Sequence, residues 1–250
     1  MTIFIAIYIT IVGLLFGSFF NVVGLRVPVG ESIVHPPSRC SNCNTRLGAK
    51  DMVPVFSYLF SKGKCRHCGV KVSPIYPLFE AATGLLFLWT FLRFGLSGAA
   101  VIGLMLVSLC VIVTVADLKY MLIPNKVLLF FAPILIVLRF VFMEAPWWHY
   151  VLGGALGGGI ILLIALLTKG MGMGDVKLFA LCGIVLGIGP TLLAFMLACA
   201  LGSIVGGLLI LLKIVQRRQP VPFGPWLALA TLIAYGYGTQ IIGGYLSLIG

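Results

Sequence analysis

The feature that most constrains this chain is a succession of eight long apolar segments separated by short polar stretches. A soluble fold cannot cover such segments, because 61% of the 250 residues are hydrophobic and only 9% are charged. A bilayer core about 30 Å thick requires roughly 20 apolar residues per crossing helix. We therefore expect an all-α polytopic integral membrane protein in the lipid bilayer, with about eight transmembrane helices, the sixth of them short for a full crossing. The expected spans are approximately 3–25, 76–92, 97–116, 127–143, 150–168, 178–189, 191–212 and 225–247.

Basic residues are distributed unevenly among the connecting stretches. The first connection, residues 26–71, contains eight lysines and arginines and only two acidic residues. Because Lys and Arg accumulate in cytoplasmic loops, we expect this connection and every second loop after it to face the cytoplasm, and both termini to lie outside. The later basic loops contain Lys119, Lys126, Lys169, Lys177, Lys213, Arg217 and Arg218. Topology therefore explains the net charge of +11, and no nucleic-acid partner is expected.

Composition divides the chain into three parts. Residues 1–25 form the first transmembrane helix, which we expect to be retained because it lacks the basic start and the small-residue cleavage site of a secretory signal. Residues 26–75 form a polar, cysteine-containing domain that is expected in the cytoplasm. Residues 76–250 contain the remaining apolar segments. The chemistry-bearing residues fall in the second and third parts.

Two of the six acidic residues lie directly against apolar segments. Asp117 ends the run VSLCVIVTVA, and Asp175 lies in GMGMGDVKLFA. Ionisable groups at such positions are costly and usually functional, and the expected topology places both on the cytoplasmic side. Two carboxylates in a partly dry pocket cannot both ionise easily, so one keeps its proton while the other activates a water for attack on a peptide carbonyl. The pair therefore indicates an aspartyl protease.

The residues around the two aspartates suit an irregular backbone. Glycines at 170, 172 and 174 allow the chain before Asp175 to leave helical geometry and to approach a substrate closely. Pro124, in the sequence LIPN, breaks the helix that follows Asp117. Irregular backbone at this depth in a membrane is tolerated where it lines a cavity, so we expect a cavity here.

A simpler interpretation of the two aspartates is that they only form ion pairs at the membrane edge. Asp117 would pair with Lys119 or Lys126, and Asp175 with Lys177. A Gly-x-Gly-Asp stretch is also a weak signal in a chain that contains 31 glycines. From the physical chemistry of these residues alone, catalysis and interface pairing both remain open.

Four of the seven cysteines form two Cys-x-x-Cys pairs in the polar domain: Cys40, Cys43, Cys65 and Cys68. Four thiolates at this spacing can close a tetrahedral site, and the pattern is a strong signature of zinc. Because the domain is too short to bury a substantial core, the metal would supply much of its folding energy and would be structural. A dithiol redox protein is the competing interpretation, but such pairs are expected on the oxidising side of a membrane.

Several stretches, in order along nearly the whole chain, resemble the type IV prepilin peptidases, which are Gly-x-Gly-Asp intramembrane aspartyl proteases: GSFFNVVGLRVP, the paired Cys-x-x-Cys loop, YPLFEAATG, ADLKYMLIPN, GMGMGDVKL and PFGPWLA. The resemblance implies that residues 76–250 form a transmembrane protease domain with Asp117 and Asp175 as its catalytic pair. The residues that would support the catalytic loop are Gly172, Gly174, Lys177 and Pro124. Substrates would be prepilins and pseudopilins of type IV pilus and secretion systems, cut after a glycine at the cytoplasmic face of the bacterial inner membrane.

The resemblance also implies a second activity, N-methylation of the new N-terminal residue with S-adenosylmethionine. In that family the cysteine loop accompanies methyl transfer, and Glu80 and Gly84 match a stretch linked to it. The simpler interpretation is that Glu80 caps or pairs at the membrane interface and that Gly84 packs a helix. No glycine-rich methyltransferase fingerprint is visible, so S-adenosylmethionine is implied by the resemblance alone.

One tension remains between the expected substrate and this chain, because a basic leader would meet a basic face. Glu31, Asp51 and Glu80 are the carboxylates of the first half that are available to offset the repulsion. A second function class is also open: a non-catalytic, zinc-bearing membrane scaffold for the assembly of a pilus or secretion system. Replacement of either aspartate by asparagine separates the two classes.

Overall fold

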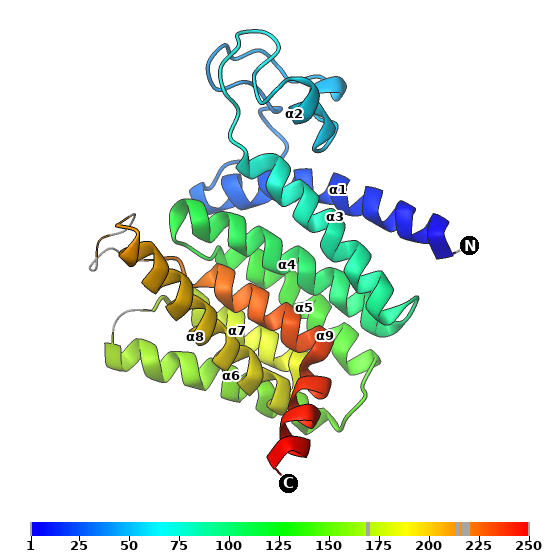
Figure 1. Ribbon diagram of the computed structural model, residues 1–250, viewed down its shortest axis with the longest axis vertical. Helices are drawn as coiled ribbons and strands as arrows, with labels where there is room; N and C mark the ends of the chain where they lie inside the picture. The colour runs from blue at the N-terminus through cyan, green and yellow to red at the C-terminus, as the bar shows by residue number, and fades with distance from the viewer. Residues whose placement is uncertain (1, 169–170, 214–215, 217–220, 250) are drawn as a thin grey trace. The chain divides into compact units, whose positions relative to one another are not determined.

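The computed structural model describes residues 2–168, 171–213, 216 and 221–249. In this part of the chain the structure is helical, with two isolated β-bridges and no longer strand, which confirms the all-α class. Lys169, Gly170, Arg217 and Arg218, to which the sequence assigns loop positions, lie outside the described residues. The long helices are α1 (Thr2–Arg26), α3 (Ile75–Phe94), α4 (Gly98–Tyr120), α5 (Asn125–Val141), α6 (Trp147–Thr168), α7 (Met173–Leu186), α8 (Ile188–Leu211) and α9 (Gly224–Ile249) (Figure 1).

Five of these helices are long and apolar enough to cross a membrane: α1, α3, α4, α6 and α8. Helix α7 has only 14 residues. At about 1.5 Å per residue it is about 21 Å long, shorter than a bilayer core, as its short apolar segment predicts. The eight long helices follow the eight predicted segments in order, and five of them have the length and composition of a full crossing.

The predicted boundaries of the sixth segment, 178–189, are wrong at both ends. Helix α7 begins five residues earlier, at Met173, because the Asp175 carboxylate accepts a hydrogen bond from the N–H of Gly172 and caps a polar first turn. It ends at Leu186, where Gly187 takes a left-handed φ of +79°. Hydropathy identifies neither feature, since both depend on polar or glycine residues.

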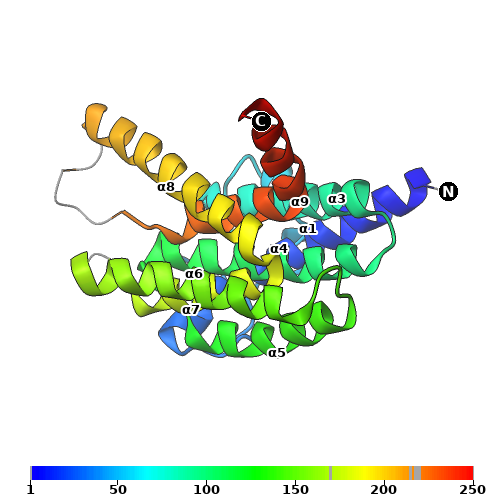
Figure 2. The same cartoon turned by 90° about the horizontal axis from the view of Figure 1, so that it is seen from below.

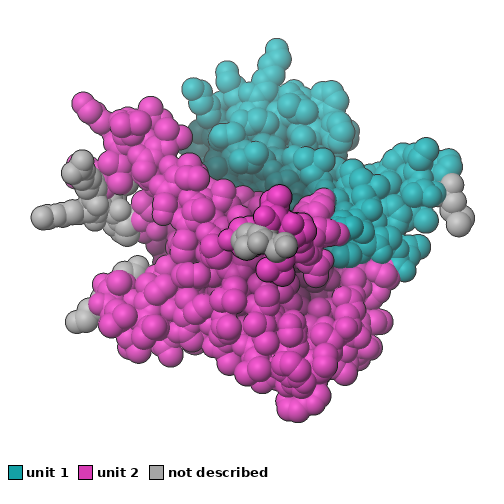
Figure 3. Space-filling model, turned by 60° about the horizontal axis from the view of Figure 1, so that its bottom comes forward, with its two compact units in different colours: residues 1–96 teal, residues 97–250 magenta. Residues whose placement is uncertain are grey.

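The chain forms two compact units, residues 1–96 and residues 97–250 (Figure 3). In the first unit, α1 and α3 run antiparallel and lie side by side (Figure 1). Their backbones approach closely because glycines lie at the crossing: an added Cβ on Gly13 would lie 2.9 Å from the Cα of Gly84, and one on Gly17 would lie 2.8 Å from the Cα of Glu80. Further along, the Asn21 side chain donates a hydrogen bond to the Tyr76 carbonyl at 3.2 Å.

The connection between α1 and α3 contains little regular structure. It includes two short 3₁₀ turns, Val27–Val29 and Ala49–Asp51, and the five-residue helix α2 (Phe56–Phe60). An antiparallel bridge between Arg39 and Arg46, and another between Lys64 and Lys71, close two small hairpins. Each hairpin contains one Cys-x-x-Cys pair.

In the second unit, α4 is the most deeply buried helix and packs against α5 and α9. Helices α6 and α7 form a hairpin and lie side by side (Figure 2). Their interface is made by glycines whose added Cβ atoms would collide with the facing backbone: on Gly157, 2.7 Å from the Phe179 carbonyl oxygen, and on Gly153, 2.5 Å from the Gly183 carbonyl oxygen. Packing this close fixes α7, and with it Asp175, relative to α6.

Candidate active site

Asp117 lies in the last turn of α4 and is buried, with 6% of its surface exposed. Its Oδ2 accepts a hydrogen bond of 2.9 Å from the N–H of Gly224, the first residue of α9. No hydrogen bond to a described residue involves its second oxygen, Oδ1. One carboxylate oxygen is therefore fixed by the backbone, and the other is left for a water or a substrate.

Gly224 is a site residue that the sequence did not single out. An added Cβ at this position would lie 2.7 Å from Oδ2 of Asp117, so that any larger residue would displace the carboxyl group. The signal in the sequence was the stretch PFGPWLA, where a glycine followed by proline starts an apolar segment. That pattern predicts a helix start, but not that its N–H reaches a residue 107 positions away.

Asp175 lies in the first turn of α7 and is half-buried. Its Oδ2 accepts a hydrogen bond of 3.2 Å from the N–H of Gly172. The free N–H groups of a helix N-terminus favour a negative charge at this position. The two glycines before it differ: an added Cβ on Gly174 would lie 2.8 Å from the Cβ of Ile123, whereas on Gly172 it would make ordinary contacts. Steric crowding therefore requires a glycine at position 174 but not at position 172.

The fold brings the two aspartates together from separate helices. The charges of Asp117 and Asp175 interact, so the two carboxyl groups lie within electrostatic reach of each other. Pro124 is buried and precedes α5, whose Asn125 accepts a hydrogen bond of 3.0 Å through Oδ1 from Lys177 Nζ. The connections α4–α5 and α6–α7 and the start of α9 thus meet at one end of the second unit.

Ion pairs at the membrane edge do not explain why the two aspartates lie beside apolar helices. Among the described residues, neither carboxylate forms an ion pair with a lysine or arginine. Lys177, the expected partner of Asp175, is hydrogen-bonded to Asn125 instead. Two carboxyl groups within electrostatic reach of each other, with no ion-pair partner among the described residues, disfavour ionisation of both, so that one keeps its proton, as acid–base chemistry on a water requires.

The four cysteines of the two hairpins form one cluster, which was expected from their spacing. Their sulfur atoms all lie within 4.8 Å of one another, and those of Cys40 and Cys68 are 3.7 Å apart. A tetrahedral zinc with Zn–S bonds of about 2.3 Å places its ligands about 3.8 Å apart, so the cluster can hold a metal ion of this kind.

Hydrogen bonds in the hairpins favour the metal-binding form of two thiols. A hydrogen bond from the backbone of Val70 lowers the pKa of Cys68 to about 6. Hydrogen bonds from Thr45 lower the pKa of Cys43. Because the thiolate is the metal ligand, these contacts favour the metal-binding form of Cys43 and Cys68.

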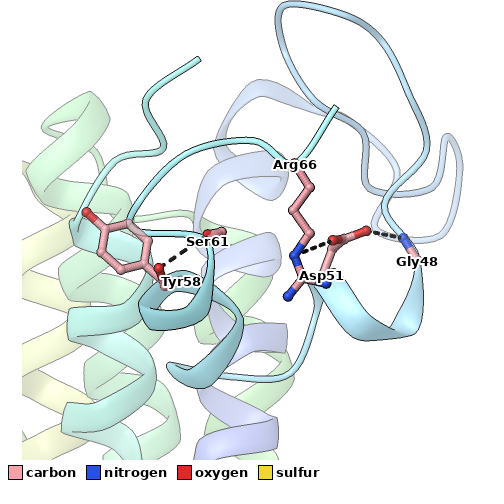
Figure 4. A network of polar contacts seen from close by, with 5 residues as sticks. All are labelled: Gly48, Asp51, Tyr58, Ser61 and Arg66. Atoms are coloured by element: carbon pink, nitrogen blue, oxygen red, sulfur yellow. Dashed lines mark hydrogen bonds and ion pairs between the residues drawn. The ribbon is translucent and has the colours of Figure 1, made fainter. Parts of the chain in front are cut away.

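A small polar network links the second hairpin, closed by the Lys64–Lys71 bridge, to the other residues between α1 and α3 (Figure 4). Arg66 Nε lies 3.5 Å from Asp51 Oδ1, and Asp51 Oδ2 accepts a hydrogen bond of 3.1 Å from the N–H of Gly48. Beside it, the Ser61 hydroxyl donates to the Tyr58 carbonyl at 3.2 Å. Asp51 is therefore engaged within the connection itself.

The first unit also contains a cavity of about 830 Å³ between the ends of α1 and α3 and their connection. Glu80 lies in its wall, and its Oε2 accepts a hydrogen bond of 2.7 Å from the N–H of Val55. Gly84, one turn further along α3, is not in the wall: an added Cβ there would lie 2.9 Å from Leu14 of α1. The structure thus separates two residues that the sequence grouped together, one at a cavity and one at a helix contact.

Comparison with known proteins gives a consistent result. A family model described as "Bacterial Peptidase A24 N-terminal domain" matches residues 11–94, and one described as "Type IV leader peptidase family" matches residues 104–207. A prepilin leader peptidase/N-methyltransferase of Bacillus subtilis (strain 168) is 39% identical over 239 residues, 95% of this chain and 96% of the relative.

Two further relatives carry the same name and align over similar lengths. The Stutzerimonas stutzeri protein is 30% identical, over 94% of this chain and 92% of the relative. The protein of Aeromonas salmonicida (strain A449) is 32% identical, again over 94% and 92%. No solved structure was found to match the chain.

Proposed function

This chain belongs to the type IV leader peptidase family, and on that premise we propose that it removes the basic leader from type IV prepilins or pseudopilins. The enzyme is a membrane peptidase with methyltransferase activity. Our assignment of its peptidase site rests on one observation: Asp117 and Asp175 come from different helices and lie within electrostatic reach of each other, and neither forms an ion pair with a described residue. The alternative of a non-catalytic scaffold gives no reason for such a pair.

In the proposed mechanism the two aspartates share the work of peptide hydrolysis. The ionised carboxylate takes a proton from a water, whose oxygen attacks the scissile carbonyl carbon. The protonated carboxyl group donates its proton to the carbonyl oxygen, and the C–N bond then breaks as the nitrogen is protonated. The Gly224 N–H fixes Asp117, and the Gly172 N–H fixes Asp175, so that each carboxyl group presents its other oxygen to the reaction.

Four residues would support this arrangement. Gly174 lets α7 approach Ile123, and Pro124 starts α5 beside it. Lys177 ties α7 to α5 through Asn125. Gly172 contributes its backbone N–H. Each acts on the position of the aspartates, and none of them is proposed to react.

We propose that the protein lies in the bacterial inner membrane with the aspartates and the cysteine cluster facing the cytoplasm and both termini outside. Support comes from the basic first connection and from the lysines of the α4–α5 and α6–α7 segments, which follow the rule for cytoplasmic loops. The resemblance to the prepilin peptidases implies cleavage at that membrane face, so this orientation is consistent with the proposed substrate.

We propose zinc as the ion of the cysteine cluster, with a structural role. The four-sulfur donor set and its spacing fit this ion, and the surrounding hairpins contain little regular structure. The sulfur atoms already fill four positions, so His67 is not needed as a ligand.

The second activity would be N-methylation of the new N-terminal residue. S-adenosylmethionine, when bound, would supply the electrophilic methyl group for this reaction. The cavity wall contains a carboxylate, Glu80, so the first unit has a group that suits a cationic ligand. Gly84 would act only through helix packing.

Co-expression with a prepilin that carries a basic leader, followed by mass spectrometry of the product's N-terminus, tests both activities together. The wild type is expected to give a shortened, methylated product. Asp117→Asn and Asp175→Asn are each expected to give the uncut prepilin with normal expression and metal content. A scaffold predicts an uncut product in all three cases, and cleavage by both variants would exclude the aspartates as the catalytic pair.

A further inference from the structure

The short helix α2, in the connection between α1 and α3, has an apolar side that the protein leaves uncovered. Phe56, Leu59 and Phe60 are 53%, 63% and 79% exposed. They stand at positions i, i+3 and i+4, so they share one side of the helix, which we call the α2 apolar face. Large apolar side chains that gather on one exposed side of a polar region mark a contact with another apolar body.

The other side of α2 is polar and faces the cavity of the first unit. Ser57, Tyr58 and Ser61 line this cavity, whereas the three residues of the α2 apolar face do not. Tyr58 also packs closely on Gly63, where an added Cβ would lie 2.8 Å from the tyrosine hydroxyl oxygen. These contacts fix the rotation of α2, so its apolar face is directed away from the interior of the connection.

One hydrogen bond fixes the position of α2 along the neighbouring helix α3. Glu80 Oε2 accepts it, at 2.7 Å, from the N–H of Val55, the residue directly before α2. Glu80 lies in the second turn of α3, and the exposed leucines of that helix already begin at Leu78 and recur every seven residues, at Leu85 and Leu92. In a helix long enough to cross a membrane, such a row is the side that meets lipid. The start of α2 is therefore held at the depth where α3 enters the bilayer.

Basic side chains bracket the α2 apolar face in the sequence. Lys50 precedes it and Lys62 follows it, both are exposed, and neither forms an ion pair with a described residue. The nearest acidic residue, Asp51, is engaged with Arg66 and Gly48. An apolar helix side with free lysines beside it is the pattern of a segment that lies in the surface of a membrane containing anionic lipids.

A helix of five residues is too short to bind lipid strongly by itself, but α2 is not an independent peptide. Its connection continues at both ends into α1 and α3, which are long enough to cross a membrane. Contact with the bilayer surface is then an intramolecular event that costs little translational freedom, so a small apolar face is sufficient.

We propose that α2 is an interfacial anchor, whose apolar face enters the lipid at the membrane surface while Lys50 and Lys62 lie at the level of anionic headgroups. Lipid is the occupant because the hydrogen bond to Glu80 holds the face at the depth of the bilayer surface and because the flanking charge is positive. The anchor keeps the connection, and with it both cysteine hairpins, at the membrane. This role goes beyond the proposed peptidase and methyltransferase activities and depends on neither.

The test is photocrosslinking of the full-length protein in nanodiscs of phosphatidylcholine and phosphatidylglycerol. Phe60→p-benzoylphenylalanine places the photoreactive group in the apolar face. Ser61→p-benzoylphenylalanine, at the next residue, places it on the side that lines the cavity and is the matched control. We expect at least about fivefold more lipid adduct from position 60 than from position 61, measured by mass spectrometry.

Leu85→p-benzoylphenylalanine, in the exposed row of α3, is the positive control for lipid labelling. All three variants should keep the zinc content and melting temperature of the unsubstituted protein. Equal lipid labelling at positions 60 and 61, no lipid adduct at position 60, or adducts to protein in place of lipid would each overturn the proposal. Failure of prepilin cleavage or methylation would leave these adducts unchanged, because the measurement reports only lipid contact.

The charge of the flanking lysines is tested in the same assay. Lys50→Glu combined with Lys62→Glu, in the protein that carries the photoreactive group at position 60, should lower the lipid adduct about three- to tenfold in nanodiscs that contain phosphatidylglycerol. In phosphatidylcholine alone, the adduct should change by less than about twofold, since no anionic headgroup is present. An equal yield with and without the two substitutions in the anionic nanodiscs would exclude the lysines from the anchor.

Discussion

The two units of this protein hold their functional groups in different ways. In the second unit, Asp117 and Asp175 lie on helices whose positions are fixed by close packing, and each carboxyl group is satisfied by one backbone N–H. In the first unit, the cysteines lie in two small hairpins with little regular structure around them. Packing therefore positions the aspartates, whereas a bound ion is needed to position the cysteines.

The largest effect should follow from removal of a carboxylate in the packed unit. Asp117→Asn or Asp175→Asn is isosteric, so the fold should remain while acid–base catalysis is lost. We expect cleavage of a prepilin to fall by at least about 10²–10⁴-fold, the usual contribution of a positioned general acid or base. The measurement is the single-turnover cleavage rate, with the melting temperature and zinc content as controls that should stay at their wild-type values.

A smaller but still large loss is expected from Gly224→Ala. The new methyl group would lie 2.7 Å from Oδ2 of Asp117, so the carboxyl group must move. Since small displacements of a catalytic group can cost about a hundredfold, we expect a decrease of roughly 10–100-fold in cleavage rate. Gly159→Ala is the control, because an added Cβ there meets no atom within 4 Å. Equal activity of the two variants would mean that the Gly224 contact does not position Asp117.

Replacement of a cysteine should affect the two activities unequally. Cys43→Ser or Cys65→Ser removes one of four clustered sulfur ligands, so zinc content should drop and the hairpins should lose order. We expect methylation to fall on the order of tenfold or more, and cleavage to fall much less, because the aspartates do not depend on the cluster for their positions. Elemental analysis and mass spectrometry of the product measure both. Cys199→Ser, at a cysteine outside the cluster, should leave the zinc content unchanged.

The smallest effect is expected at Lys177. Its Nζ makes one hydrogen bond with Asn125 and is exposed to solvent, so the tie between α5 and α7 should contribute little beside their apolar packing. Lys177→Ala should reduce cleavage about two- to threefold. A decrease comparable with that of Asp175→Asn would instead place Lys177 in the reaction. The steady-state cleavage rate at saturating prepilin distinguishes these results.

Much of the architecture was predictable because hydrophobicity alone determines it. Segments of about 20 apolar residues must cross a bilayer as helices, since no water is present there to satisfy the backbone. The cysteine cluster was equally predictable, because two Cys-x-x-Cys pairs have few other uses in a short polar connection. The exception was α7, whose start depends on the capping of its first turn by Asp175 and not on hydropathy.

The composition and local patterns of the sequence determined that this chain is helical, lies in a membrane, carries four clustered thiols and places two aspartates beside apolar helices. Only the tertiary structure decided that Asp117 meets Gly224 and comes within reach of Asp175, and that Asn21 and Glu80 share a cavity. The physical reason is distance along the chain. Hydrogen bonds between residues far apart in sequence depend on which glycine-rich helices pack against each other. Glycine spacing marks a helix face that can pack closely, but it does not specify the partner helix.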